Sequence, residues 1–448
     1  MPDTIIAQAT PPGSSAISVI RISGDLTSSI AKAACKIEFP APRRANLADY
    51  HTLSNDCIDQ VILTYYQKEK SYTGEEILEI CTHGNPLIVE LIIKDLLQRG
   101  CRIAEPGEFT RKAFLAGKID LTQAEAVAKI IKSKSQAELK IANNNLRGKL
   151  SDKLIEQQNH MLDLKAKLEA YVDFPEDDIP QKDKQLLLGE IYNVQSAISK
   201  LIQSAEETKS FKGKVKALLI GPPNAGKSTI FNSLIGSERA LVSEEAGTTR
   251  DYINEDLFLD DFIVEIIDAA GIHNGEGHLE VAGIDKALSL IPEVDLLICI
   301  LDSSLPYPSE FFSLVKLNET KKVLLVENKT DLERALQWND QPFENTISIT
   351  ATNEDDIKDL KNYIGDILRE YFNYDPKHSL AIEARHVIHL KEIEESLHKS
   401  KSLLEHGEDF ELVSFELEEG MIAIGNIIGA KDNEDVLDSL FNQFCIGK

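Results

Sequence analysis

Cysteine is scarce in this chain of 448 residues, and none of its six cysteines has a partner at a spacing typical of a metal site. There is no CxxC pair and no Cys/His combination of the zinc-binding type. A fold that needs no disulfide suits a reducing compartment, so we expect the protein in the cytoplasm. The cysteines are Cys35, Cys57, Cys81, Cys101, Cys299 and Cys445. Five of the six are expected to occupy core or surface positions without a chemical role.

Long apolar runs are also missing. The longest runs, such as residues 296–301, are far shorter than the ~20 residues that a membrane-spanning helix needs. The pattern of a folded domain begins as early as residue 3, so no targeting segment is expected. We therefore expect no membrane partner.

Positive charge is low, with 48 Lys and Arg against 74 Asp and Glu and a net charge of −26. This balance argues against a general nucleic-acid binder, because phosphate contacts require lysine and arginine. Any RNA would have to meet a local patch. The most basic stretch comprises Lys129, Lys132, Lys134, Lys140, Arg147, Lys149 and Lys153. On an amphipathic helix, such a stretch is more often a solvated face than an RNA-binding surface.

A phosphate-binding loop stands out at residues 221–229, Gly-Pro-Pro-Asn-Ala-Gly-Lys-Ser-Thr. It follows the apolar run 215–220 and precedes a helical pattern at 230–235, which is the strand–loop–helix context that this motif requires. The glycines let backbone N–H groups curl around phosphate oxygens, Lys227 reaches the β and γ phosphates, and the Ser228 hydroxyl can bind Mg²⁺. The sequence therefore predicts binding of a nucleoside triphosphate.

The base is indicated by Asn328-Lys329-Thr330-Asp331, which follows the apolar run 323–326. The Asp331 carboxylate can accept hydrogen bonds from both N1–H and the 2-amino group of guanine, which adenine cannot offer. Asn328 and Lys329 are expected to brace the loop and cover the ring. Further on, Thr350-Ala351 fits either the last base-contacting loop of a GTPase or a plain strand end.

Two switch segments are expected between these motifs, at 247–251 and at Asp268-Ala269-Ala270-Gly271. Thr249 is the natural second protein ligand of Mg²⁺, Asp268 would hold the ion through water, and the Gly271 N–H would meet the γ phosphate. The next residue, Ile272, cannot orient the attacking water as the glutamine of many small GTPases does. No arginine finger is evident either.

The predicted GTP contacts are Asn224, Ala225, Gly226, Lys227, Ser228, Thr229, Ser243, Glu244, Glu245, Ala246, Gly247, Thr248, Thr249, Asp268, Ala269, Ala270, Gly271, Asn328, Lys329, Thr330, Asp331, Thr350 and Ala351.

Seven short motifs carry a resemblance to a known family. They are residues 3–13, 21–24, 72–75, 106–111, 123–126, 173–176 and 444–448. In them the chain resembles the MnmE (TrmE) family of tRNA-modification GTPases over essentially its whole length. It departs from the usual family pattern at Ser14-Ser15-Ala16, Asn85, Ala269 and His273, none of which is needed for GTP hydrolysis.

The resemblance implies how hydrolysis is catalysed. A K⁺ ion replaces the arginine finger and would be bound by Asn224 and Thr248, with carbonyl groups of Ser243 and Glu245. Water orientation would fall to Glu280, in the segment 280–284, although the residues alone suggest an exposed helix glutamate there. The expected catalytic residues are thus Asn224, through the K⁺ ion, Glu280, and Lys227 of the phosphate loop.

The resemblance also implies an amino-terminal domain that dimerises and binds 5-formyl- or 5,10-methylene-tetrahydrofolate. Its contacts would be Arg21, Glu79, Lys118 and Lys448, because cations suit the glutamate tail and a carboxylate suits the aminopyrimidine edge of the pterin. Cys445 is either a thiol near the one-carbon unit or a small residue in a docked tail.

Periodicity and the resemblance together predict a multidomain α/β protein. Its parts are an α+β, folate-binding and dimerising domain at 1–118, a helical domain in two parts at 119–210 and 376–448, and a Ras-like P-loop GTPase domain at 211–375 inserted between those parts.

The implied activity is that of a K⁺-dependent GTPase that modifies C5 of the wobble uridine of certain tRNAs. It would act as a homodimer in a heterotetramer-like complex with an MnmG-type protein that uses FAD. The alternative is a ribosome-assembly GTPase that makes no covalent change. Such a factor would carry a basic KH-like module and would have no use for a folate-type domain or the Cys-Ile-Gly-Lys end. A membrane-remodelling GTPase lacks support, because no basic amphipathic or apolar anchor is present.

Overall fold

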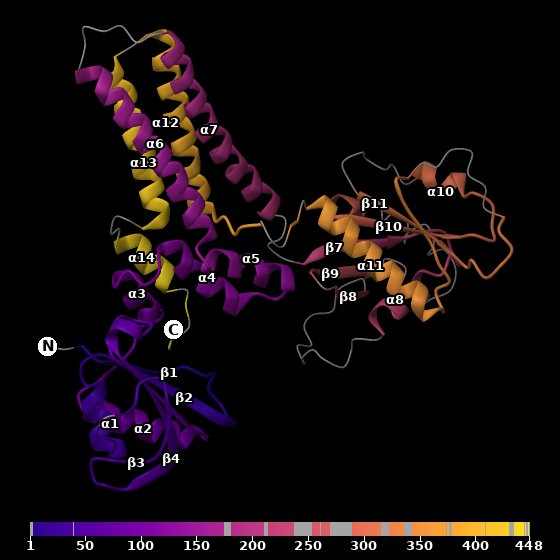
Figure 1. Ribbon diagram of the computed structural model, residues 1–448. Helices are drawn as coiled ribbons and strands as arrows, with labels where there is room; N and C mark the ends of the chain where they lie inside the picture. Colours follow the sequence, from indigo (N-terminus) through magenta and orange to yellow (C-terminus); the bar gives the residue numbers. More distant parts are fainter. Residues whose placement is uncertain are drawn as a thin grey trace. The chain divides into compact units, whose positions relative to one another are not determined.

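The computed structural model describes residues 3–38, 40–173, 181–209, 214–236, 253–259, 261–268, 289–314, 322–335, 343–372, 374–375, 379–407, 409–429, 434–442, 444 and 447. The chain divides into two compact units (Figure 1). The first comprises Met1–Ile131, Asn145–Lys200 and Glu383–Lys448, and the second Lys132–Asn144 and Leu201–Ile382. The GTPase segment is thus inserted between helical segments, as expected. Residues 132–144, 201–210 and 376–382, which were predicted for the helical domain, belong to the second unit.

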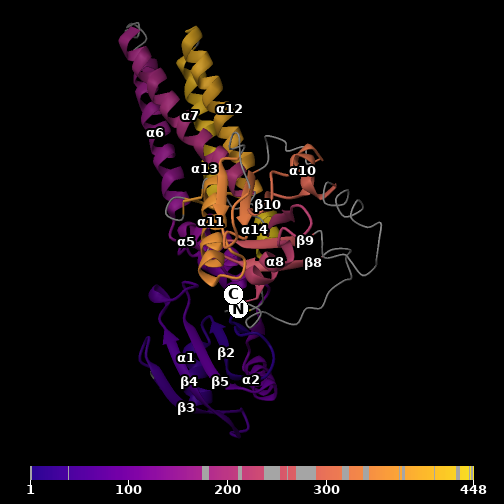
Figure 2. The same cartoon turned by 90° about the vertical axis from the view of Figure 1, so that its right-hand side faces the viewer.

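The amino-terminal part of the first unit is an α+β layer, which confirms the predicted class. Its six-stranded sheet has the order β3-β4-β5-β2-β1-β6. Ile30 of α1 and Ile92 and Leu96 of α2 pack with strand residues in one buried cluster, so these helices cover one face of the sheet (Figure 2). The elements are β1 (Ile5–Gln8), β2 (Ser15–Ser23), α1 (Thr27–Cys35), β3 (Ala45–His51), β4 (Cys57–Tyr66), η1 (Lys68–Lys70), β5 (Ile77–Gly84), α2 (Pro86–Gln98), β6 (Arg102–Ile103) and α3 (Glu108–Leu115).

The rest of the first unit is helical, with α6, α7, α12 and α13 side by side in both views (Figures 1 and 2). Buried residues recur alternately four and three positions apart, which is the spacing of helices that pack lengthwise in a bundle. In α6 the residues with this spacing are Leu150, Leu154, Gln157, Met161, Leu164 and Leu168. The helices are α4 (Leu121–Lys132), α6 (Lys149–Asp173), α7 (Gln181–Lys209), α12 (Ala384–His406), α13 (Phe410–Ile428) and α14 (Glu434–Phe441).

The second unit is built on a six-stranded sheet of order β12-β11-β10-β7-β9-β8. All neighbours are parallel except β8, which runs antiparallel to β9. The parallel strands therefore end at one common edge, where ligands of such sheets bind. The elements are α5 (Gln136–Leu146), β7 (Val215–Ile220), α8 (Lys227–Ile235), β8 (Ile253–Phe258), β9 (Ile263–Asp268), η2 (Ile291–Glu293), β10 (Leu296–Asp302), α10 (Ser309–Leu314), β11 (Lys322–Asn328), β12 (Asn345–Ser348) and α11 (Glu354–Tyr371).

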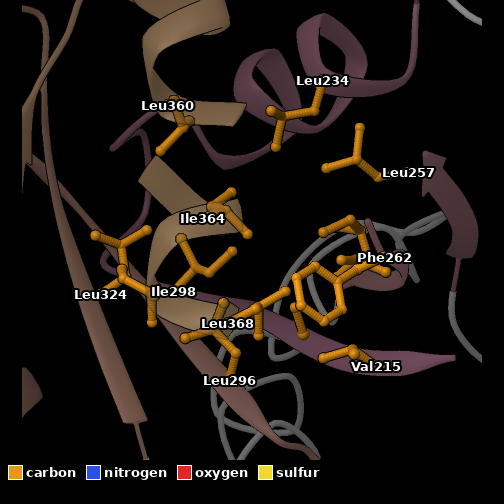
Figure 3. Close-up of a cluster of buried hydrophobic side chains, with 14 of the residues drawn as sticks. Val215, Leu234, Leu257, Phe262, Leu296, Ile298, Leu324, Leu360, Ile364 and Leu368 are labelled. Atoms are coloured by element: carbon orange, nitrogen blue, oxygen red, sulfur yellow. The ribbon is translucent and has the colours of Figure 1, made fainter. Parts of the chain in front are cut away.

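The sheet of the second unit is apolar on both faces, as expected for buried parallel strands. One face meets α8 and α11, and Figure 3 shows Leu234 of α8 and Leu360, Ile364 and Leu368 of α11 among the strand residues. The three α11 residues lie four positions apart and so share one side of the helix. In the described part of the chain, no helix is both long and apolar enough to cross a membrane.

Candidate functional site

The phosphate-binding loop follows β7, as predicted, and α8 begins at Lys227 directly after it. Gly226 has φ +99°, and a Cβ there would lie 2.2 Å from Nδ2 of Asn328, so only glycine fits. Asn224 also adopts a left-handed conformation, with φ +60°. The loop thus curls at the amino end of a helix, where unpaired N–H groups and the helix dipole favour an anion.

Lys227 is folded back into this loop. Its Nζ donates hydrogen bonds of 2.9 Å to the carbonyl oxygens of Gly221 and Pro222. Burial lowers the pKa of Lys227, and the nearby Asp268 carboxylate opposes that change. The ammonium group therefore lies inside the loop, within reach of any phosphate that the loop holds.

Ser228 and Asp268 converge at the same edge of the sheet. The Ser228 Oγ donates to Asp268 Oδ2 at 3.5 Å, and Asp268 is buried at the end of β9. A hydroxyl and a carboxylate are the oxygen ligands that Mg²⁺ prefers, so this pair fits the ion that the sequence predicts.

Asn328 connects three loops of the site. Its Nδ2 donates to the Ala225 carbonyl at 2.9 Å, and its Oδ1 accepts from the Ala351 N–H at 3.0 Å. The Thr330 and Thr350 hydroxyls are 3.0 Å apart. The loop at Thr350-Ala351 is therefore joined directly to the predicted guanine loop and, through Asn328, to the phosphate loop.

Asp302 is a site residue that the sequence analysis missed. It ends β10, and its Oδ2 forms an ion pair of 2.6 Å with Lys329 Nζ. The Ser303 Oγ donates to the Lys329 carbonyl at 3.0 Å. Burial would raise the pKa of Asp302, but hydrogen bonds from Lys329 and Ser304 lower it below its usual value. Its position at the end of the apolar run 296–301 was the available signal.

Other predicted residues of this site lie outside the described part of the chain. They are Ser243, Glu244, Glu245, Ala246, Gly247, Thr248, Thr249, Ala269, Ala270, Gly271 and Glu280. Cys445 and Lys448, predicted for the folate site, also lie outside it.

A cavity of about 410 Å³ in the first unit contains Arg21 and Glu79 in its lining. Arg21, on β2, and Glu79, on β5, are directly opposite in the strand register and form an ion pair of 2.7 Å. The Arg21 guanidinium also donates to the Gly447 carbonyl at 3.3 Å, so the carboxyl-terminal segment reaches this site. A charged pair beside a cavity can bind a ligand that carries both an acidic and a donor-rich group.

The rest of the lining was not predicted from sequence and combines aromatic and hydroxyl groups with the aliphatic side chains of Ile77, Val127 and Leu146. The Tyr66 hydroxyl donates to Glu79 Oε2 at 3.3 Å, and the Tyr72 and Thr110 hydroxyls are 3.1 Å apart. Lys118, in contrast, lines another cavity of about 520 Å³ and donates to the Glu69 carbonyl at 2.7 Å. The structure brings Arg21 and Glu79 together and places Lys118 apart from them.

Known proteins resemble the chain along its full length. A family model described as the MnmE helical domain matches residues 121–445, and one described as the GTP-binding protein TrmE N-terminus matches residues 4–118. The tRNA modification GTPase MnmE of Opitutus terrae is 38% identical over 100% of this chain and 99% of its own. That of Aquifex aeolicus is 34% identical over 100% of both chains. Among solved structures, the G domain of the T. maritima FeoB iron transporter matches 36% of this chain and 99% of its own, with 22% identity and a TM-score of 0.25.

Proposed function

Because the chain belongs to the MnmE family of tRNA modification GTPases, we propose that it installs a (carboxymethyl)aminomethyl group at C5 of the wobble uridine (U34) of certain tRNAs. The chain is a GTP hydrolase that acts in tRNA modification. In the finer proposal, an FAD-dependent, MnmG-type partner and a tetrahydrofolate one-carbon donor supply the remaining chemistry, in the cytoplasm. The main support for the proposal is that the same chain contains both a P-loop nucleotide site and the Arg21–Glu79 cavity.

Asp331 is proposed to select guanine. It is exposed at the loop that Asn328 ties to the phosphate loop, so its carboxylate is free to meet a base held there. Ser228 and Thr249 are the proposed protein ligands of Mg²⁺, and the approach of Ser228 to Asp268 supports this choice. When bound by these residues, Mg²⁺ would offset the negative charge of the phosphates. The remaining predicted contacts with GTP are proposed for the same site.

The charge that develops during hydrolysis is proposed to be met by K⁺. Asn224 is proposed to supply one oxygen ligand of K⁺ through its side chain, together with Ser243, Glu245 and Thr248. Its exposure and its left-handed conformation in the loop support this choice. Glu280 is proposed to orient the attacking water. The K⁺ ion would take the place of an arginine finger, and Glu280 would take the place of the glutamine, whose position is occupied by Ile272.

The Arg21–Glu79 cavity is proposed to bind 5-formyl- or 5,10-methylene-tetrahydrofolate, which would supply the one-carbon unit. Arg21 would hold a carboxylate of the glutamate tail, and Glu79 would accept from the aminopyrimidine edge. The hydrogen bond from Arg21 to Gly447 supports a role for Cys445 and Lys448, the neighbours of Gly447 in sequence. Lys118 belongs to this proposal only through the resemblance, since it lines the other cavity.

A homodimer through the amino-terminal domain is also proposed. The face of its sheet opposite α1 and α2 carries exposed apolar side chains. Leu47, Ile62 and Ile17 are 68%, 45% and 57% exposed, and Leu47 and Ile62 are register partners on β3 and β4. A second copy covering this face would remove them from water. The division at residues 118, 210 and 375 stays a proposal as well.

The function is tested by mass spectrometry of wobble uridines from cells with and without this protein. We expect the C5-modified nucleoside only when the protein is present. Unchanged tRNA nucleosides in its absence would favour the ribosome-assembly GTPase.

A further inference from the structure

Helix α5 (Gln136–Leu146) belongs to the GTPase unit as far as Asn144, although its neighbouring helices in the chain do not. It lies between α4 and α6, which belong to the first unit, and is covalently joined to both. Ala137 and Ile141 of α5 are buried in the same hydrophobic cluster as Leu257 of β8 and Phe262, which precedes β9. Helix α5 is therefore built into the core of the GTPase fold.

A buried carboxylate fastens α5 to the turn between β8 and β9. Asp261, which is 5% exposed, accepts a 2.8 Å hydrogen bond from Lys140 Nζ on α5 and another of 2.8 Å from Arg369 Nε on α11. The Asp261 carbonyl also accepts from the Ala137 N–H at 3.2 Å. Burial would raise the pKa of Asp261, but the bonds from Lys140 and Arg369 lower it. The carboxylate is therefore ionised and held by two cations.

The two strands that meet at this turn lead to the two predicted switch segments. Strand β8 begins at Ile253, shortly after the first switch segment, and β9 ends at Asp268, where the second begins. Ile253 pairs with Asp268 at one end of the ladder and Phe258 with Ile263 at the other. From Ile253 to Phe258 the strand advances five residues at about 3.3 Å per residue. The turn therefore lies roughly 17 Å from the edge of the sheet where the nucleotide is expected. Asp261 therefore lies at the opposite end of the β8–β9 pair from the predicted switch segments.

We propose that Lys140 and Asp261 are positioning residues that couple the nucleotide state of the β8–β9 pair to α5, and through α5 to the helices at its two ends. A helix can respond to a small movement of neighbouring strands only if specific contacts link it to those strands. The Lys140–Asp261 ion pair and the Ala137 hydrogen bond provide this attachment. The inference rests on the proposed switch segments, but it does not depend on the tRNA chemistry. It also gives one lysine of the basic stretch a role other than RNA contact.

The experiment is hydrogen–deuterium exchange of the full-length protein with Mg²⁺ and K⁺, comparing GDP with a non-hydrolysable GTP analogue. The variants are Lys140→Gln, Lys140→Arg and, as matched control, Lys134→Gln at an exposed lysine just before α5. Lys140→Gln leaves Asp261 paired with Arg369, so no buried charge loses its last partner. Nucleotide affinity and turnover on the same samples show whether the GTP site itself is intact.

In the native protein, the two nucleotides should give different exchange in α5 and in α6 (residues 149–173). In Lys140→Gln this difference should be lost in α6, while GTP turnover stays near normal. Lys140→Arg and Lys134→Gln should keep it. An undiminished difference in Lys140→Gln would overturn the proposal, even if exchange rises equally in both states, and so would the lack of any difference in the native protein.

Discussion

At the level of single residues, the guanine loop is held by groups that are not part of its own motif. Asn328 was predicted to brace this loop, and its side chain joins the loop to Ala225 and Ala351 by two hydrogen bonds. Asp302 was not predicted, although its carboxylate fixes Lys329. A tetrapeptide pattern shows which residues face a base, but the partner of Lys329 comes from another strand. Only the parallel pairing of β10 with β11, in which Asp302 is opposite Asn328, brings them together.

Asp302→Asn should weaken GTP binding. The change removes the charge that is paired with Lys329, which is proposed to cover the base. A hydrogen bond to a charged group is worth about 1.5–3 kcal/mol, or roughly 10- to 100-fold in affinity. Titration with a fluorescent GTP analogue measures it. Asp359→Asn, at an exposed position of α11, is the control and should bind normally. Equal affinities in the two variants would show that Lys329 needs no anchor.

Glu280→Ala should slow GTP hydrolysis without weakening GTP binding. A group that orients the attacking water acts toward the transition state, so its loss lowers the turnover rate by about a hundredfold or more and leaves affinity nearly unchanged. Single-turnover kinetics and nucleotide titration separate the two effects. A near-normal turnover rate would show that Glu280 has no catalytic role.

Hydrolysis should be faster in K⁺ than in Na⁺ at equal ionic strength, by about tenfold or more, because the proposed site must match the radius of the ion as well as its charge. Asn224→Ala should remove most of this difference. Equal rates in both salts, or a variant that is stimulated as strongly as the native protein, would exclude a K⁺ site at Asn224.

At the level of elements, the type of secondary structure of each segment was easier to predict from the sequence than its packing partner. The apolar run 215–220 and the motif that follows it form the strand, loop and helix that were expected. The segment that became α5 was also expected to be helical. Its apolar side shows that it packs on something, but the same pattern would suit the helical bundle as well as the GTPase core. The choice is made by Asp261, Lys140 and Ala137, which meet only after folding.

Ile364→Ala in α11 should destabilise the GTPase unit by about 2–5 kcal/mol, as is usual when a large buried side chain leaves a cavity. Ile364 is completely buried between α11 and the sheet (Figure 3). Lys358→Ala, at an exposed position of the same helix, is the control. Chemical denaturation followed by circular dichroism gives the difference in the free energy of unfolding. A cost close to that of Lys358→Ala would mean that the α11 contact contributes little.

At the scale of the whole molecule, one chain contains two sites in two compact units. The insertion of the GTPase segment into a helical domain was predicted from the return of helical periodicity after Pro376, and it is confirmed. The Arg21–Glu79 cavity was predicted only through the family resemblance. Its tyrosines lie on β4 and in the segment before β5, and no local pattern joins those positions to β2. The proposed function requires both sites for one product.

The most direct test of that claim is the fraction of C5-modified wobble uridine in cells that carry only a variant of this protein. Lys227→Ala, at the phosphate loop, and Glu79→Gln, in the cavity, should each leave the nucleoside as unmodified as complete loss of the protein does. Lys153→Ala, at an exposed lysine of α6, should restore it. Purified Glu79→Gln should still hydrolyse GTP at the normal rate, which shows that it is folded. Full modification in cells with Glu79→Gln would contradict the claim, because the cavity would then have no part in the reaction.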